Sequence, residues 1–250
     1  MRLTVLGCNG TYPTPGRPAS GYLVETDHAR IWMDAGSGTF AALQDVIPAD
    51  SIDAIILTHE HSDHCLDIFG FAYARRYGSP DLPAVPTFAP SAVRDRLKAF
   101  IGREGSAVFE ALEFRPVDGL SVVEFDDLTV SFCPTNHPVP TVAVRVRHGD
   151  QIYGYTSDTG VDPDLVGFFE DADALLIEAS YQGHPSAKPW PHHLTATEAG
   201  SLARLAGVRR PILTHLWPTL DPRVSAAEAA TGYGGEVEVA GPGMIIEEAM

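Results

Sequence analysis

The segment "THEHSDH", residues 58–64, places three histidines and one aspartate within six consecutive positions. His59 and His61 lie two residues apart, so an extended chain points both imidazoles to the same side. A turn after them would bring Asp63 and His64 towards the same space. A capped helix start needs one such polar residue rather than four. The segment therefore predicts a loop that faces two metal ions, and neutral imidazole with carboxylate suits zinc, as well as iron or manganese.

Further ligand-type residues follow segments that we expect to be strands. His137 stands in "PTNHPVP", Asp158 in "YTSDTG" and His215 in "ILTHLWP". Taken singly, Asp158 could form an Asx-turn before Gly160, and either histidine could be a hydrogen-bonded core residue. Together with the histidine-rich segment, they are expected to complete the metal site.

The surrounding sequence predicts a mixed α/β protein. "IDAIILT" is a nearly continuous apolar run, typical of a strand covered on both faces, and it leads directly to His59. Strands are predicted at residues 2–7, 21–26, 30–36, 52–58, 128–135, 141–147, 151–157, 172–179 and 210–215. Helices are predicted from an N-cap at Ser62 to Gly78, at 91–101, and at 196–206 after a cap at Thr195. Because no repeat or long linker interrupts this pattern, we expect residues 1–250 to form a single domain.

Composition excludes several classes of protein. The formal net charge of −16 argues against a surface built for nucleic acid, because phosphate binding depends on clustered Lys and Arg. The three cysteines are scattered, so a disulfide framework is not expected. No apolar run reaches the roughly 20 residues that span a bilayer, and the start of the chain lacks a signal-peptide pattern. A cytoplasmic protein is expected.

The metal-ligand pattern resembles that of the metallo-β-lactamase superfamily, in the order of its residues and in the elements that carry them. The resemblance extends over essentially the whole chain. It implies a four-layer αβ/βα sandwich, in which two sheets pack face to face with helices outside and the metals sit at one edge. Two ions are then expected, with His59, His61 and His137 on one, Asp63, His64 and His215 on the other, and Asp158 bridging them.

A second motif is more specific. The segment "LLIEASYQGHPSAKPWPHHLTATEAG" resembles the Glu-Ala-x-x and His-x-Thr-x-x-x-Ala pattern of the ribonuclease Z-like phosphodiesterase branch, onto which Glu178 and His193 fall. His192 beside it could be the inward residue instead, and His184 is also near. The opening "LGCNGTYPTPGRPASGYLVE" resembles a bacterial subgroup that includes cyclic-nucleotide phosphodiesterases. Asp34 in "MDAG" resembles a buried aspartate that orients the ligand loop, although a strand-end turn would look the same.

These features predict a metal-dependent hydrolase. Two adjacent ions would activate a water for attack on phosphorus and neutralise charge on the phosphate oxygens. Asp63 could take up a proton from the nucleophile, while His193, oriented by Glu178, would protonate the departing ribose oxygen. The predicted substrate is a small phosphodiester such as a 3′,5′-cyclic nucleotide. Because dimers are usual among similar proteins, we expect a homodimer.

Three alternatives remain at this level. A true ribonuclease Z grips transfer RNA with a long arm, which the family carries between the positions of His137 and Asp158, but here only twenty residues separate them. A lactone, thioester or β-lactam hydrolase would leave Glu178 and His193 without an obvious role. A metal-stabilised binding module or redox protein is the non-hydrolytic alternative. A diiron redox relative would be expected to have Glu in place of His61.

Overall fold

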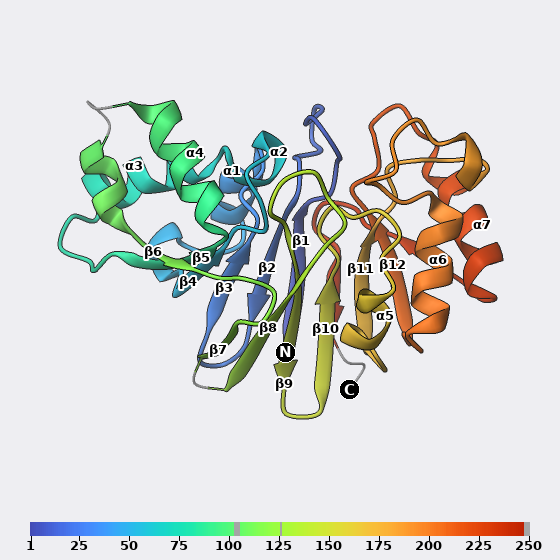
Figure 1. Cartoon of the computed structure of the whole chain (residues 1–250). Helices are drawn as coiled ribbons and strands as arrows, with labels where there is room; N and C mark the ends of the chain where they lie inside the picture. The colour runs from blue at the N-terminus through green and yellow to red at the C-terminus, as the bar shows by residue number, and fades with distance from the viewer. Residues whose placement is uncertain (103–105, 126, 248–250) are drawn as a thin grey trace.

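Two seven-stranded sheets face each other in the computed structural model, which describes residues 1–102, 106–125 and 127–247 (Figure 1). The first sheet contains, in order across it, β14 (Ile245–Glu247), β1 (Arg2–Gly7), β2 (Gly21–Glu25), β3 (Arg30–Met33), β4 (Ala54–Ile56), β5 (Val85–Ala89) and β6 (Leu112–Pro116). The second contains β13 (Glu238–Val239), β12 (Arg210–Thr214), β11 (Ala174–Glu178), β10 (Gln151–Tyr155), β9 (Val142–His148), β8 (Leu128–Pro134) and β7 (Val122–Phe125).

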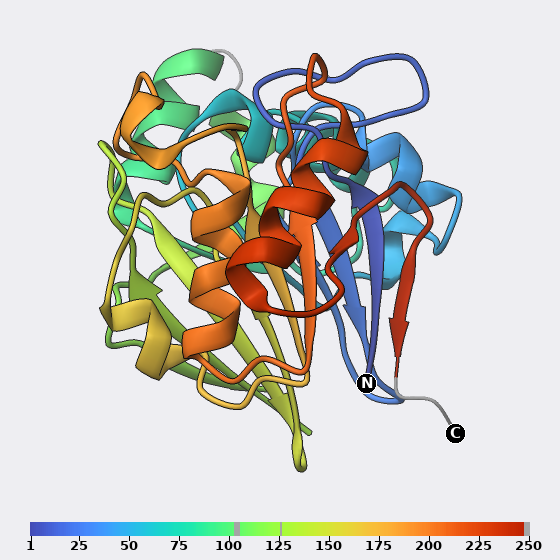
Figure 2. The same cartoon turned by 90° about the vertical axis from the view of Figure 1, so that its right-hand side faces the viewer.

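Helices lie on both outer sides of the paired sheets, which confirms the predicted αβ/βα sandwich. On the side of the first sheet lie α1 (Thr39–Gln44), α2 (Ser62–Cys65), α3 (Ile68–Gly78) and α4 (Ser91–Ile101), with the 3₁₀ turns η1 (Ala49–Ser51) and η2 (Ser106–Ala111). On the other side lie α5 (Asp164–Phe168), η3 (Pro185–Ala187), α6 (Ala196–Leu205) and α7 (Pro222–Tyr233). Figure 2 shows α6 and α7 packed together outside the second sheet.

The strand before the histidine-rich segment shows why its sequence is apolar throughout. Successive side chains of a strand point to opposite faces. Ala54 and Ile56 join the core between the two sheets. Ile55 and Leu57 join the core between the first sheet and its helices. Both faces are buried, as the continuous apolar run predicted, so the chain reaches His59 in a fixed register.

Parallel strands deliver the site residues to one end of the sandwich. In the first sheet β3 pairs in parallel with β4. In the second sheet β10, β11 and β12 are parallel, and Glu178 at the end of β11 lies opposite Thr214 at the end of β12. Because the carboxyl ends of parallel strands meet at the same edge, the loops that follow these strands converge there.

The predicted helix from Ser62 to Gly78 is wrong in two respects. Ser62 is the first helical residue, and His61 takes the N-cap position without a side-chain cap. The helix is also divided into α2 and α3, because the backbone N–H of Asp67 leaves the helical pattern and donates to the carbonyl of Ala35 at 2.8 Å. The predicted cap at Thr195 is confirmed, as a capping box with Glu198.

Several elements were not predicted. They are β5, β6, β7, β13 and β14 among the strands, and α1, α5 and α7 among the helices. The three cysteines are free in the structure. Within the described ranges, none of the helices combines the length and apolar character needed to cross a membrane.

Candidate metal centre

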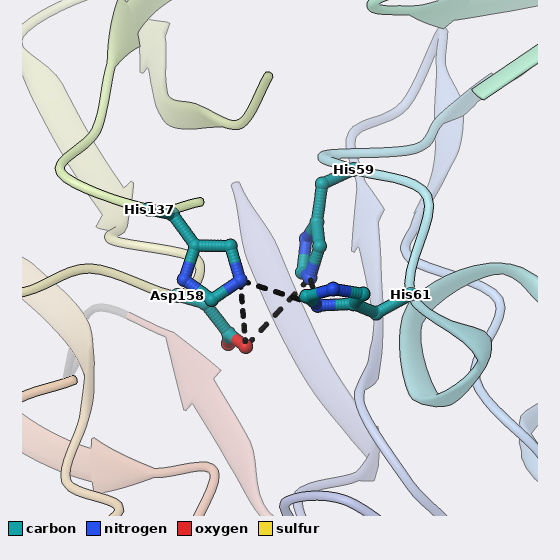
Figure 3. Close-up of side chains that lie close together, drawn as sticks. All are labelled: His59, His61, His137 and Asp158. Atoms are coloured by element: carbon teal, nitrogen blue, oxygen red, sulfur yellow. Dashed lines mark hydrogen bonds and ion pairs between the residues drawn. The ribbon is translucent and has the colours of Figure 1, made fainter. Parts of the chain in front are cut away.

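All seven predicted ligands meet in two groups at the end where the parallel strands finish. His59, His61, His137 and Asp158 form the first group, with one candidate ligand atom from each within 4.8 Å of the others (Figure 3). The second group joins Asp63, His64 and His215 within the same limit. Loops and one short helix supply them: the segment after β4 and helix α2, the β8–β9 loop, and the loops after β10 and β12.

Asp158 belongs to the first group and also contacts the second, with one oxygen directed to each set of histidines. Its Oδ2 lies 3.7 Å from Nε2 of His59 and 3.9 Å from Nε2 of His137. Its Oδ1 lies 3.3 Å from Nε2 of His64 and also 3.3 Å from Nε2 of His215. Asp158 is only 2% exposed, and the neighbouring histidines hold its pKa well below the usual range despite its burial. A buried, ionised carboxylate of this kind has the geometry of a bridging ligand.

The second group is equally compact. Nε2 of His215 lies 3.2 Å from Oδ2 of Asp63. Burial favours the neutral acid, yet His64 and His215 hold the pKa of Asp63 below its usual range. The backbone N–H of Thr11 donates to the same Oδ2 at 2.7 Å, so the orientation of this carboxylate is fixed from outside the group.

The donor set fits transition-metal ions. Nε2 of His64 and Oδ1 of Asp158 are buried and without a hydrogen-bond partner in the described chain, although a buried polar atom left unpaired costs about 1–3 kcal/mol. A cation between them would satisfy both atoms. Burial lowers the pKa of His59 and His61 and lowers that of His137 to about 4, so these rings are neutral at neutral pH, the form that binds metals.

Asp34 orients the second group, as its resemblance suggested. It is fully buried, and its Oδ2 lies 2.7 Å from Nδ1 of His64. The backbone N–H of Thr58 donates to Oδ1 of Asp34 at 2.8 Å. The hydroxyls of Thr58 and Tyr155 donate to Oδ2 of Asp34 at 2.9 and 3.0 Å. A hydrogen-bonded carboxylate on the outer nitrogen fixes the tautomer of a metal-binding histidine.

Backbone strain is concentrated around the centre. Left-handed φ angles are costly for residues other than glycine and persist where the surrounding structure enforces them. In the described ranges the non-glycine residues with positive φ are Thr11, Asp34, Ser157, Asp171 and His215. Only Asp171 lies away from the ligand groups. Ser157 donates to the hydroxyl of Thr58 at 2.7 Å and lies 3.4 Å from Nδ1 of His59.

His193, rather than its neighbour, faces the centre. Its Nδ1 lies 2.8 Å from Oε1 of Glu178 and 4.0 Å from Oδ2 of Asp158. Burial opposes a charged ring, but the Glu178 carboxylate raises the pKa of His193 to about 9. Nδ1 of His192 instead lies 3.0 Å from Oδ1 of Asn136, and the exposed His184 contacts Ser186 outside the centre.

Glu178 is held in place before any substrate arrives. Its side chain is fully buried and accepts hydrogen bonds from the backbone N–H groups of Thr159 and Ser180, both at 3.0 Å. The supporting residues Thr11, Tyr155, Ser157 and Ser180 were not predicted. Nothing in their local sequence separates them from other polar residues of strand ends and loops, because they contact residues far away in the sequence, such as Asp63 for Thr11 and His215 for Ser180.

The fold and the two histidine and aspartate groups define a metallo-hydrolase of the metallo-β-lactamase fold. Residues 19–216 match the family described as "Beta-lactamase superfamily domain". The chain therefore belongs to the beta-lactamase superfamily.

Individual relatives agree with this membership. "Probable metallo-hydrolase YhfI" of Bacillus subtilis is 29% identical over 251 residues, covering 99% of this chain and 100% of that protein. Its crystal structure superimposes with a TM-score of 0.89 at 27% identity, covering 99% of both chains. "Uncharacterized protein Rv1339" of Mycobacterium tuberculosis is 33% identical over 244 residues, 95% of this chain and 88% of that one. "Ribonuclease Z" of Kineococcus radiotolerans is 28% identical over 287 positions, 95% of this chain and 91% of that one.

Proposed function

We propose that this protein is a two-metal phosphodiesterase that acts on small diesters, and in particular on 3′,5′-cyclic nucleotides. The observation that carries the proposal is the pair formed by His193 and Glu178, which stands beside the carboxylate shared by both ligand groups. A charged imidazole at this place is a proton donor for a leaving oxygen, which the departure of an alcohol from phosphorus requires.

Two metal ions have a defined place in this proposal. His59, His61 and His137 would hold one ion, Asp63, His64 and His215 the other, and Asp158 would reach both. Zinc is the proposed metal, with manganese or iron as alternatives, because neutral imidazole and carboxylate suit all three. Bound there, the ions supply Lewis-acid neutralisation of charge on the phosphate and a lowered pKa for an attacking water.

The remaining steps belong to side chains. Because Nδ1 of His193 is engaged by Glu178, Nε2 is the ring atom that gives a proton to the leaving ribose oxygen. Donation to the 3′ oxygen of a cyclic nucleotide would release the 5′-monophosphate. We assign the uptake of a proton from the nucleophile to the carboxylate of Asp63, whose Oδ2 lies 3.2 Å from Nε2 of His215 in the second group.

The short segment between His137 and Asp158 supports a small substrate. More than half of the twenty residues there belong to β9 and β10, an antiparallel pair in which His148 lies opposite Gln151 across a tight turn. The ribonuclease Z relative aligns over more positions than this chain has residues, so it carries segments absent here. A net charge of −16 also disfavours a long polyanion.

A ribonuclease Z activity is the second candidate, because a relative with that name aligns with most of the chain. Lactone hydrolysis stays an alternative that the substrate comparison decides, because its leaving alkoxide also needs a proton. Thioester hydrolysis is disfavoured, since a thiolate leaves without protonation and the pair of Glu178 and His193 then has no evident task. A metal-stabilised binding module without catalysis is disfavoured for the same reason. Homodimer formation and a cytoplasmic location stay predictions from the sequence.

A direct comparison of substrates tests the proposal. Metal-loaded protein is incubated separately with bis(p-nitrophenyl) phosphate, cyclic AMP, cyclic GMP, a lactone and a precursor transfer RNA, and the products are separated by chromatography. We expect hydrolysis of the aryl diester and of at least one cyclic nucleotide, with the 5′-monophosphate as the nucleotide product. Cleavage of the RNA with both cyclic nucleotides intact would favour the ribonuclease instead, and turnover of the lactone alone would contradict the phosphodiesterase class.

A further inference from the structure

One buried hydroxyl lies between the second ligand group and the proton donor. Oγ of Ser180 is 3.0 Å from Nδ1 of His215 and 3.3 Å from Nδ1 of His193. Ser180 is fully buried, and its backbone N–H donates to Oε2 of Glu178 at 3.0 Å. The same residue therefore contacts a candidate metal ligand, the proposed acid and the carboxylate that holds the acid.

The direction of the hydrogen bond with His215 follows from the other side of its ring. Nε2 of His215 faces the carboxylate oxygens of Asp63 and Asp158 at 3.2 and 3.3 Å, so this is the atom available to a metal. A neutral imidazole that offers Nε2 as a ligand carries its proton on Nδ1. Nδ1–H therefore donates to Oγ of Ser180, which selects the tautomer that binds metal.

The imidazole rings of His193 and His215 also lie against each other. The imidazoles of His193 and His215 are stacked, with centroids 5.8 Å apart and planes 9° from parallel. Ser180 is held in place, because the backbone N–H of the adjacent Ala179 donates to the carbonyl of Thr214 at 3.0 Å where β11 and β12 end. A shift of one ring therefore changes the contact that the hydroxyl makes with the other.

We propose that Ser180 is a positioning residue that couples the second metal position to the proton donor. Its hydroxyl fixes the ligand tautomer of His215 and, through the same atom, the placement of His193 against Glu178. The part concerning the donor rests on the proposed phosphodiesterase function, whereas the part concerning His215 does not.

The variant Ser180→Ala tests both contacts. Removing the hydroxyl leaves Nδ1–H of His215 without its acceptor in a site where that residue is 1% exposed. Loss of such an outer contact typically weakens metal binding about 10- to 100-fold. We expect this loss at one of the two metals, measured by competition with a chromogenic chelator. In fully metal-loaded protein, we also expect a larger rate loss on diesters with poor leaving groups than on bis(p-nitrophenyl) phosphate.

Two variants serve as controls. Ser180→Thr keeps the hydroxyl and should restore both the metal affinity and the leaving-group dependence of the wild type. Ser225→Ala removes another fully buried serine hydroxyl, which accepts from Nε2 of Gln182 at 2.8 Å, and should alter neither measurement.

The outcomes separate this inference from the proposed function. Unchanged metal affinity in Ser180→Ala would overturn the assigned contact with His215. Weakened affinity with an unchanged leaving-group dependence would overturn the coupling to His193. If the wild type hydrolyses no phosphodiester at all, the proposed function fails, and the chelator competition still decides whether Ser180 supports His215.

Discussion

At the scale of single residues, the hydrogen-bond partners of the outer ring nitrogens decide which nitrogen each candidate histidine can offer to a metal. His64 has Asp34 on its outer nitrogen, and His215 has Ser180. The outer nitrogen of His137 lies 3.2 Å from the backbone carbonyl of His192. Each partner can accept a hydrogen bond from the N–H of the outer nitrogen, which leaves the inner nitrogen free as a ligand. The outer contacts therefore prepare His64, His137 and His215 to offer the inner nitrogen to a metal.

The proton donor gives the first prediction. His193→Ala should keep both metals yet slow hydrolysis of diesters with poor leaving groups by about a hundredfold or more, the usual scale for loss of a general acid. The loss should be much smaller for p-nitrophenolate, which departs without protonation. Steady-state rates over a series of leaving groups measure this, with His192→Ala as the matched control because its side chain contacts Asn136. Equal losses along the series would assign His193 another role.

The carboxylate behind the donor gives a second prediction, in the pH profile. Glu178 stabilises the imidazolium and thereby raises the pKa of His193 to about 9, against the opposing effect of burial. The acid form is required, so kcat for a poor leaving group should fall as pH rises through this pKa. Glu178→Gln removes the stabilising charge, lowers the pKa and should move the alkaline limb to lower pH. If the alkaline limb of the Glu178→Gln profile stays at the pH of the wild type, the limb does not report the titration of His193.

At the scale of elements, the sequence was most informative where local patterning decides structure. The buried strand β4 and the capping box at Thr195 follow from their own residues. The break after α2 does not, because it depends on a bond from Asp67 to Ala35, thirty-two positions earlier. The short strand β7 was also missed, since it lies at the edge of its sheet and Val122 is 59% exposed. The candidate ligands could be recognised from the histidine-rich segment and from polar residues that follow predicted strands. The contacts of Tyr155, Ser157 and Ser180 could not, because they join residues that are distant in the sequence.

The close approach of two loops gives an element-scale prediction. The loop after β1 runs beside the loop after β12, where Asn9 pairs in parallel with Leu216 and the N–H of Gly10 donates to the carbonyl of Leu216 at 2.9 Å. A Cβ on Gly10 would lie 2.6 Å from the backbone oxygen and 2.9 Å from Nδ1 of His215. Gly10→Ala should therefore displace His215 and reduce metal content from two ions towards one. Gly167→Ala, where a Cβ meets nothing within 4 Å, is the control. Full metal content in the Gly10 variant would contradict this account.

At the scale of the whole molecule, the centre joins the two halves of the sandwich. The first sheet and its helices contribute His59, His61, Asp63 and His64, while the loops of the second sheet contribute His137, Asp158 and His215. Neither half carries a complete set for two ions. Metal bound here would make contacts that exist only when both sheets are folded and packed, so binding free energy is expected to appear as stability of the whole chain.

This arrangement predicts that metal stabilises the fold of the complete protein. A ligand that binds only the native state at a hundredfold excess over its Kd contributes about 2.7 kcal/mol, and about 2–4 °C in Tm accompanies each kcal/mol for chains approaching this size, so we expect a shift of roughly 5–10 °C. The measurement is thermal unfolding of metal-loaded and chelator-treated protein. His215→Ala, which removes a ligand from the second position only, should show a reduced shift. If the two wild-type preparations melt together, the seven residues do not form a metal centre that binds across the sheets, because such a centre cannot be filled without stabilising the packed state.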